Sequence, residues 1–217
     1  ISLLMQCGAD LVFLDGALGR SHHASPAMAD GVVLATGAAL GGGMDDVLRK
    51  TQDRLAILGI PAAPSELLAL VNATFEKAGV GIWNTQGECL FNEAITTLNA
   101  APVILAHQRD QVGAIAVSGA VGVRLWQALQ AIAQAHPGLQ LVVADGTKLF
   151  VDATELHAFT RMGAKVLARR PVRLAGITLN PYSPFGGSFD ADAFLTRARQ
   201  AFPHHLVTDV LLTKEDA

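Results

Sequence analysis

Short apolar runs alternate with helical patterns along almost the whole chain, and this alternation is the strongest constraint on the fold. The runs have the length of buried strands and are bounded by Gly, Pro, Asn or Asp; they cover residues 11–14, 32–35, 103–106, 114–117, 139–143 and 174–179. Helical periodicity lies between them, over residues 45–58, 65–78, 121–135, 153–162 and 191–201. Such alternation specifies right-handed crossovers. The sequence therefore predicts an α/β fold with a mainly parallel, doubly wound sheet and helices on both faces.

Residues 79–92 interrupt the alternation. GVGIW, NTQG and ECLFN follow one another there, which predicts two short strands around a turn, a small antiparallel hairpin on the sheet edge. A chain of 217 residues without a linker suits a single α/β domain over residues 1–217, with residues 61–64 as the place where two halves would join. The chain begins at Ile1 rather than Met, in what resembles the middle of a helix, so an N-terminal truncation is one interpretation.

Composition limits the kinds of partner that this chain could bind. Hydrophobic residues make up 51% of the chain and charged residues 16%, as in layered folds, and this apolar content is compatible with a homo-oligomer. The net charge of -3 and the scattered cations argue against a nucleic-acid partner. The charge-free residues 31–44 are too short to span a membrane. Cys7 and Cys89 have no ligand or disulfide spacing, which is typical of reduced cytoplasmic thiols.

Asp15 ends the apolar run of residues 11–14 and enters a Gly-containing loop that leads to Arg20. Ligands of open α/β sheets collect at the carboxyl ends of strands, where an Asp holds the Mg²⁺ of a bound nucleotide. Asp15 is therefore a candidate metal ligand and catalytic residue of the Walker B kind, with Arg20 available for a phosphate. The alternative is that Asp15 caps a turn and pairs with Arg20.

Two Gly-rich loops could cradle an anion. Residues 35–46 lack a Lys and place Asp45 and Asp46 at the start of the next helix, so a bound phosphate would be repelled there. Gly119 and Gly122 lie between a strand and a helix and permit close backbone approach, which makes them candidate cofactor-binding residues. Their GxxG pattern is shorter than the dinucleotide fingerprint, and a plain tight turn is the alternative.

Asp145 and Lys148 flank the end of another predicted strand. They are candidate catalytic residues that would hold a metal and a phosphate or carboxylate, since this end of the sheet would also carry Asp15. An Asp-Gly turn with a solvated Lys is the alternative.

A further strand ends at Asn180 and enters a long polar and aromatic loop, residues 181–190. The Asn180 amide could read a base or ribose edge, Ser183 is a further candidate contact, and Tyr182 and Phe185 could stack on a ring. A loop that leads into a helix capped by Asp190 is the alternative. The seven histidines show no metal-ligand spacing, and no nucleophile motif is present.

Four strings, LDGALGR, SPAMADGVVLATGAAL, VVADGTKLF and LNPYSPFGGSFD, together resemble a poorly characterised bacterial family. That family is often encoded beside adenosylcobalamin-dependent lysine or ornithine aminomutases and is similar to P-loop NTPases of the metallochaperone and dethiobiotin-synthetase kind. The resemblance spans most of the chain and implies that Asp15 faces Mg²⁺ and that Asn180 contacts the base. It transfers no role to Asp145 or Lys148. The wider class carries a phosphate loop on its first strand, and this sequence begins after the place of such a strand.

Three functions follow as hypotheses. The first is a nucleotide-binding accessory or reactivating protein, using ATP or GTP with Mg²⁺, for a cobalamin-dependent amino-acid aminomutase, and it includes a Mg-dependent NTPase activity. The second is a non-catalytic subunit that docks a partner through the edge hairpin and residues 181–190. The third is a small-molecule enzyme that uses Asp15, Asp145 and Lys148.

Overall fold

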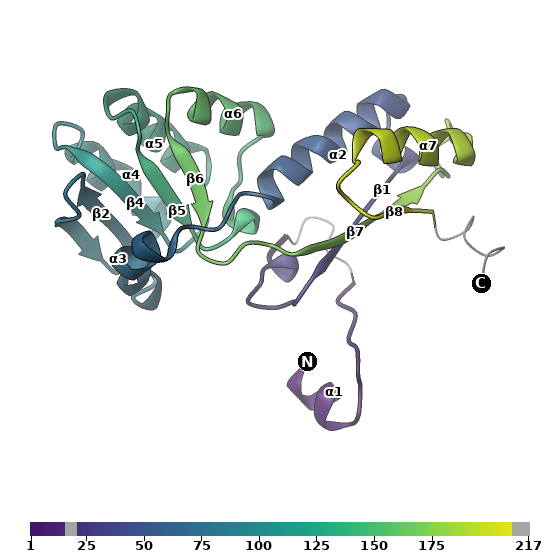
Figure 1. Cartoon of the computed structure of the whole chain (residues 1–217), viewed down its shortest axis with the longest axis horizontal. Helices are drawn as coiled ribbons and strands as arrows, with labels where there is room; N and C mark the ends of the chain where they lie inside the picture. Colours follow the sequence, from purple (N-terminus) through teal and green to yellow (C-terminus); the bar gives the residue numbers. More distant parts are fainter. Residues whose placement is uncertain (16–20, 210–217) are drawn as a thin grey trace.

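The protein has an α/β fold, as predicted, but its strands form two sheets instead of one (Figure 1). The structure is a computed structural model, and it describes residues 1–15 and 21–209. One sheet has five strands in the order β3-β2-β4-β5-β6, and the other has three in the order β1-β7-β8. Figure 1 shows them side by side, joined by the long helix α2.

The five-stranded sheet is mixed. Its strands are β2 (Val80–Asn84), β3 (Cys89–Glu93), β4 (Val112–Val117), β5 (Gln140–Val143) and β6 (Lys165–Ala168). The strands β4, β5 and β6 are parallel, whereas β2 pairs antiparallel with both β3 and β4. The predicted hairpin is therefore confirmed, with β3 at the sheet edge.

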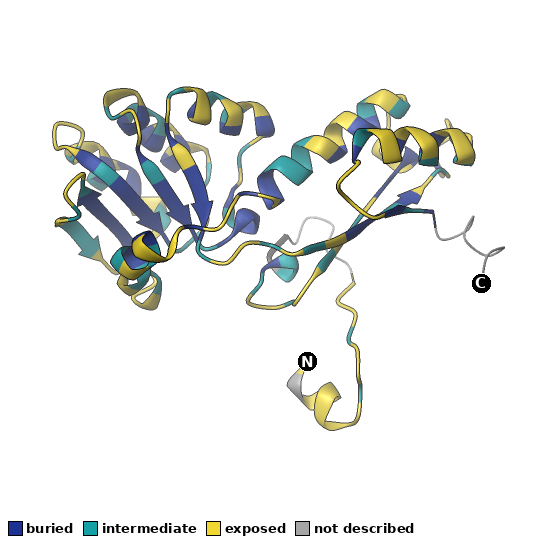
Figure 2. Cartoon of the chain, in the orientation of Figure 1, coloured by how far each residue is buried: buried dark blue, intermediate teal, exposed yellow. Residues whose placement is uncertain are grey.

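Helices cover both faces of this sheet, as is usual where the central strands are parallel. They are α3 (Ser65–Glu76), α4 (Thr97–Ala106), α5 (Val123–Ala135) and α6 (Ala153–Arg161). The side chains of α4, α5 and α6 build the larger core, around fully buried Trp126 and Phe159, whose ring centroids are 4.8 Å apart. The helix α3 packs on the opposite face against Trp83 and Val142. Figure 2 shows β2, β4, β5 and β6 as mostly buried, whereas the edge strand β3 is not.

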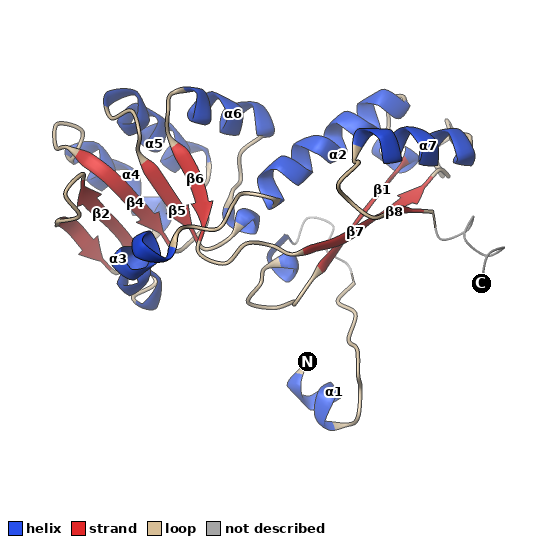
Figure 3. Cartoon of the chain, in the orientation of Figure 1, coloured by secondary structure: helices blue, strands red, loops and turns tan. Residues whose placement is uncertain are grey.

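The three-stranded sheet is parallel throughout. Its strands are β1 (Val32–Gly37), β7 (Leu174–Asn180) and β8 (Val207–Thr208), and its helices are α2 (Met44–Leu58) and α7 (Ala191–Ala201). A separate core forms where Val47 of α2 and Phe194 of α7 pack against Ile177 of β7. Figure 3 shows the chain entering the five-stranded sheet after α2 and returning from β6 to β7.

The helix α2 serves both cores. Val47 and Leu48 near its start belong to the core of the three-stranded sheet, whereas Ile57 near its end belongs to the larger core of the five-stranded sheet. A helix of 15 residues spans about 22 Å. The predicted boundary at residues 61–64 follows directly after it, where the chain passes into the five-stranded sheet.

Most predicted elements are present, and two strands are wrong. Residues 103–106 lie in α4, because this apolar run continues a pattern that is apolar on all sides, and such a run does not distinguish a buried strand from a buried helix. Residues 11–14 have no regular structure, and Leu11, Phe13 and Leu14 are exposed. The neighbouring strand β1 pairs only with β7 within the described residues. No helix in residues 1–15 or 21–209 is long and apolar enough to cross a membrane.

Candidate functional site

The structure places the predicted site residues in three separate regions. Gly119, Gly122, Asp145 and Lys148 lie in loops at the carboxyl edge of the five-stranded sheet. Asn180 and Ser183 follow β7 of the three-stranded sheet, and Asp15 lies on the N-terminal segment. Arg20 lies outside the described residues.

The backbone of the loop from β4 to α5 lies close to neighbouring elements. Ser118 Oγ donates to the carbonyl of Gly79 at 2.9 Å. A Cβ on Gly119 would lie 2.9 Å from Cγ2 of Thr97, at the start of α4. Space is open at Gly122, which is the N-cap of α5. The start of α5 is therefore accessible from the carboxyl edge of the sheet.

The N-terminus of α5 carries no side-chain cap and no acidic residue in its first turn. The N–H groups of a first helical turn have no partner inside the helix, and the helix dipole favours an anion beside them. Arg124 is exposed in this turn and adds a positive charge. These features suit a phosphate or carboxylate group.

The N-terminus of α2 has the opposite character. Asp45 and Asp46 lie in its first turn, and a Cβ on Gly42 would lie 2.4 Å from Oδ2 of Asp46. Hydrogen bonds from Lys50 and Arg49 hold the pKa of Asp46 below its ordinary value of 3.8, so this carboxylate is ionised at neutral pH. The Gly-rich residues 41–43 are thus a poor anion site, which agrees with the interpretation from the sequence.

Asp145 follows β5 and is buried. One carboxylate oxygen accepts from Ser25 Oγ at 2.7 Å, and the other accepts from the Thr147 N–H at 2.8 Å and from Thr147 Oγ1. Asp145 thereby caps the short 3₁₀ helix η3 (Gly146–Lys148). Through Ser25 it also holds the 3₁₀ helix η1 (Ser21–Ala24), which precedes β1, against the five-stranded sheet. These bonds give Asp145 a structural role, and its catalytic role stays a prediction.

Direct hydrogen bonds join the β4 and β5 loops. The Val121 N–H donates to the Lys148 carbonyl at 2.8 Å, and the Phe150 N–H donates to the Val121 carbonyl at 2.9 Å. Within the described chain, no ion pair involves the Lys148 side chain, which is half-buried. One edge therefore combines the accessible start of α5 with Lys148.

Three further residues at this edge, Ser25, Arg169 and Arg170, have no local signal in the sequence. Ser25 lies 120 positions before its partner Asp145, and no local pattern marks such a pair. Arg169 Nε donates to Asn72 Oδ1 at 3.0 Å, and its guanidinium lies 5.0 Å from the Phe75 ring centroid. Arg170 donates to the Pro26 carbonyl at 2.8 Å. Both arginines thus hold elements together at the end of β6.

Asn180 lies at the carboxyl end of the other sheet. Its Oδ1 accepts from the Tyr182 N–H at 3.0 Å, so the amide shapes its own loop. Ser183 is buried; its Oγ accepts from the Phe185 N–H at 3.3 Å, and its N–H donates to Ser188 Oγ at 3.0 Å. Tyr182 and Phe185 are exposed. A nucleotide base at this loop stays a prediction.

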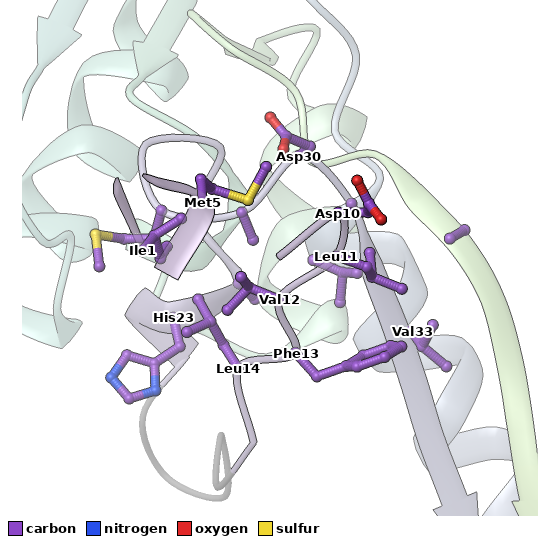
Figure 4. A pocket seen from close by; sticks show the side chains of 16 residues that line it. Ile1, Met5, Asp10, Leu11, Val12, Phe13, Leu14, His23, Asp30 and Val33 are labelled. Atoms are coloured by element: carbon purple, nitrogen blue, oxygen red, sulfur yellow. The ribbon is translucent and has the colours of Figure 1, made fainter. Parts of the chain in front are cut away.

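Asp15 is exposed at the end of an irregular segment instead of a strand. Its assignment as a Mg²⁺ ligand was based on a preceding strand that the structure does not contain, so this assignment stays a prediction. The residues before it line a cavity of about 530 Å³, shown in Figure 4. Among the described residues, no group of three His, Cys, Asp or Glu side chains could hold a metal ion.

No protein-family model matches this chain, and neither a curated protein nor a solved structure matches it.

Proposed function

We propose that this chain binds the phosphate groups of a nucleotide, ATP or GTP, at the carboxyl edge of its five-stranded sheet. The main support for the proposal is the start of α5. Its N-terminus has no side-chain cap and no acidic residue in the first turn, and it is accessible beside the loop that holds Lys148. Backbone N–H groups would bind the phosphate oxygens, and Lys148 and Arg124 would add charge.

The described residues fit a phosphate better than a protein-bound Mg²⁺. Both carboxylate oxygens of Asp145 already accept hydrogen bonds, and Asp15 lies on the separate N-terminal segment. Mg²⁺ often keeps several waters and reaches a protein through substrate phosphates. The ion would therefore arrive with the nucleotide.

The wider role that we propose is that of an accessory protein that maintains or reactivates a cobalamin-dependent amino-acid aminomutase. Its support is the resemblance of the four strings described above. Nucleotide binding to one of two conformations would supply the free energy for such a role, because a ligand shifts the equilibrium toward the state that it binds better.

The thermal midpoint of the chain, measured with ATP, GTP or pyrophosphate, tests phosphate binding. A ligand at about one hundred times its Kd should raise the midpoint by about 5–10 °C. Gly122→Asp should remove this shift, because it places a carboxylate where the phosphate would bind. Gly122→Ala is the control: space is open for its Cβ, and it neither caps the helix nor carries a charge, so the shift should persist.

The outcomes separate the alternatives. Equal losses in the Asp and Ala variants would show that the charge at Gly122 does not matter, which contradicts an anion site at the start of α5. A shift with nucleotides but none with pyrophosphate would place recognition on the nucleoside, near Asn180 for example. No shift with any ligand would overturn the proposal and leave partner binding as the better account. Reactivation of an inactivated aminomutase by this chain with nucleotide tests the wider role.

A further inference from the structure

The three-stranded sheet has one open face. Thr36 of β1 points toward α2, since its Oγ1 lies 2.6 Å from Thr51 Oγ1. Successive side chains of a strand point to opposite faces, so Val33 and Ala35 face away from α2. Val33 is 54% exposed. Both α2 and α7 lie on the same side of this sheet (Figure 1), where their side chains share one core. Parallel sheets in proteins are normally covered on both faces.

Apolar side chains of the N-terminal segment extend this open face. Phe13 lies beside Val33 in the cavity shown in Figure 4, and Leu11, Leu14 and Met5 line the same cavity. Phe13 is 82% exposed, and Leu11 and Leu14 are exposed as well. We call the side chains of Met5, Leu11, Phe13, Leu14 and Val33 the N-terminal apolar surface. Contiguous exposed apolar side chains of this kind mark interaction sites.

The charged side chains among the described lining residues of the cavity are acidic. Asp10 and Asp30 line the cavity and lie toward one side of it in Figure 4. No Lys or Arg is among the lining residues in the described part of the chain. His23 is the other titratable side chain of the lining. An occupant that completes the surface would therefore be apolar on the side facing Phe13 and Val33 and positively charged beside Asp10 and Asp30.

Because the apolar side chains are mostly exposed, a small molecule in the cavity would leave much of them in water. A helix is the element that covers a parallel sheet in α/β folds, and it offers a long apolar stripe. We propose that the N-terminal apolar surface binds a basic amphipathic helix of a partner protein. Its apolar face covers Phe13 and Val33, and its Lys or Arg side chains pair with Asp10 and Asp30. This site is distinct from the proposed phosphate site and does not depend on it.

Fluorescence anisotropy with designed peptides tests this inference. The probe is a fluorescein-labelled peptide of about 18 residues in which Leu and Lys follow helical periodicity. A second peptide has Glu in place of every Lys, and a third has the first composition in a scrambled order. At physiological salt, the Leu–Lys helix should bind saturably, and the other two should bind at least about tenfold more weakly.

Two double variants locate the binding. Phe13→Ser with Val33→Ser should weaken the Leu–Lys peptide by about tenfold or more, because it removes the apolar contact. Asp10→Asn with Asp30→Asn should weaken it by about threefold to tenfold and should not weaken the Leu–Glu peptide, because it removes carboxylates that repel Glu. Matched controls are Leu98→Ser, which removes a side chain that is 84% exposed on α4, and Glu66→Gln, which removes an exposed carboxylate on α3. Neither control should change the affinity.

Because Phe13 and Val33 are exposed, all four proteins should keep their circular dichroism and thermal midpoint. Equal binding of the Leu–Lys and Leu–Glu helices, or equal losses in the control variants, would overturn the proposal. Self-association of the chain that the Phe13 and Val33 variant abolishes would assign the surface to a second copy and overturn it too. Binding to phosphatidylcholine vesicles, lost in the same variant, would assign it to a lipid surface with the same consequence.

Discussion

The two sheets of this protein differ in how completely they are covered. The five-stranded sheet lies between α3 on one face and α4, α5 and α6 on the other, and its loops at the carboxyl edge bond to one another. The three-stranded sheet has helices on one face and exposes Val33 on the other. The first sheet is covered on both faces, whereas the second has a core on one face and leaves apolar area of the other in water. The closed sheet thus suits a small charged ligand and the open one a partner.

Truncating a buried side chain in the five-stranded sheet should have the largest effect on stability and tests how the coverage of the two sheets differs. Ile115 of β4 is fully buried, so Ile115→Ala should lower the free energy of unfolding by about 2–5 kcal/mol. Val33→Ala on the open face should cost less than about 1 kcal/mol, because Val33 is half exposed. Urea denaturation measures both. A large loss from Val33→Ala would show that something covers this face in solution.

A proline in α2 tests whether this helix couples the two cores. Gln52 lies on the exposed side of the helix, and Gln52→Pro should cost about 3 kcal/mol, because it removes a hydrogen bond and clashes with the preceding turn. Both tryptophans, Trp83 and Trp126, lie in the five-stranded half, so their fluorescence reports that half alone. In the native chain, the unfolding transitions measured by fluorescence and by circular dichroism should coincide. In the proline variant they should occur at different denaturant concentrations. Gln52→Ala is the control, and coincident transitions in the proline variant would exclude α2 as the coupling element.

Removal of the Asp145 carboxylate tests the hydrogen bond between Ser25, which follows η1, and Asp145, which follows β5. Asp145→Ala leaves the buried hydroxyls of Ser25 and Thr147 without this acceptor and should cost about 1–3 kcal/mol. Ser25→Ala removes the hydrogen bond to Asp145, together with a longer one that Ser25 Oγ accepts from the Ala27 N–H at 3.4 Å, and should cost about 1 kcal/mol. A double-mutant cycle in urea isolates the Ser25–Asp145 interaction. Additive losses would mean that this bond contributes nothing to the packing of η1 on the five-stranded sheet.

Local patterns in the sequence predicted the helices and the hairpin well. The bounds of α7 at Ala191 and Ala201 match the prediction, because Asp190 caps the helix and the apolar spacing is regular. The short strands β6 and β8 were missed, since four and two residues carry too little periodicity. The division into two sheets depends on which strands pair, and long-range pairing leaves no local pattern.

The same difference between local patterns and long-range contacts explains which parts of the candidate site could be predicted. Gly119, Gly122, Asp145 and Lys148 share one edge because β4 and β5 are adjacent and parallel. Asp15 does not follow a strand, because the apolar run before it has no pairing partner among the described residues. The three bonds that Asp145 accepts come partly from Ser25, which only the tertiary fold brings near.

The first turn of α2 is acidic, whereas that of α5 is not. Removing a charge from α2 tests this difference and should have the smallest effect of these changes. Asp46 pairs with Arg49 and Lys50, each at 2.7 Å, and these pairs are partly exposed. The lowered pKa of Asp46 means that its stabilising effect is complete above the ordinary value of 3.8 and is lost as the pH falls through the lower pKa of the folded state. Asp46→Asn should therefore lower the thermal midpoint slightly at neutral pH, less than any change above, and salt should reduce the difference. Asp53→Asn is the control, since Asp53 contacts Arg49 alone among these cations. Because protonated Asp46 and Asn are nearly alike, the two midpoints should converge in acid, and a constant difference would show that the first turn of α2 does not depend on this negative charge.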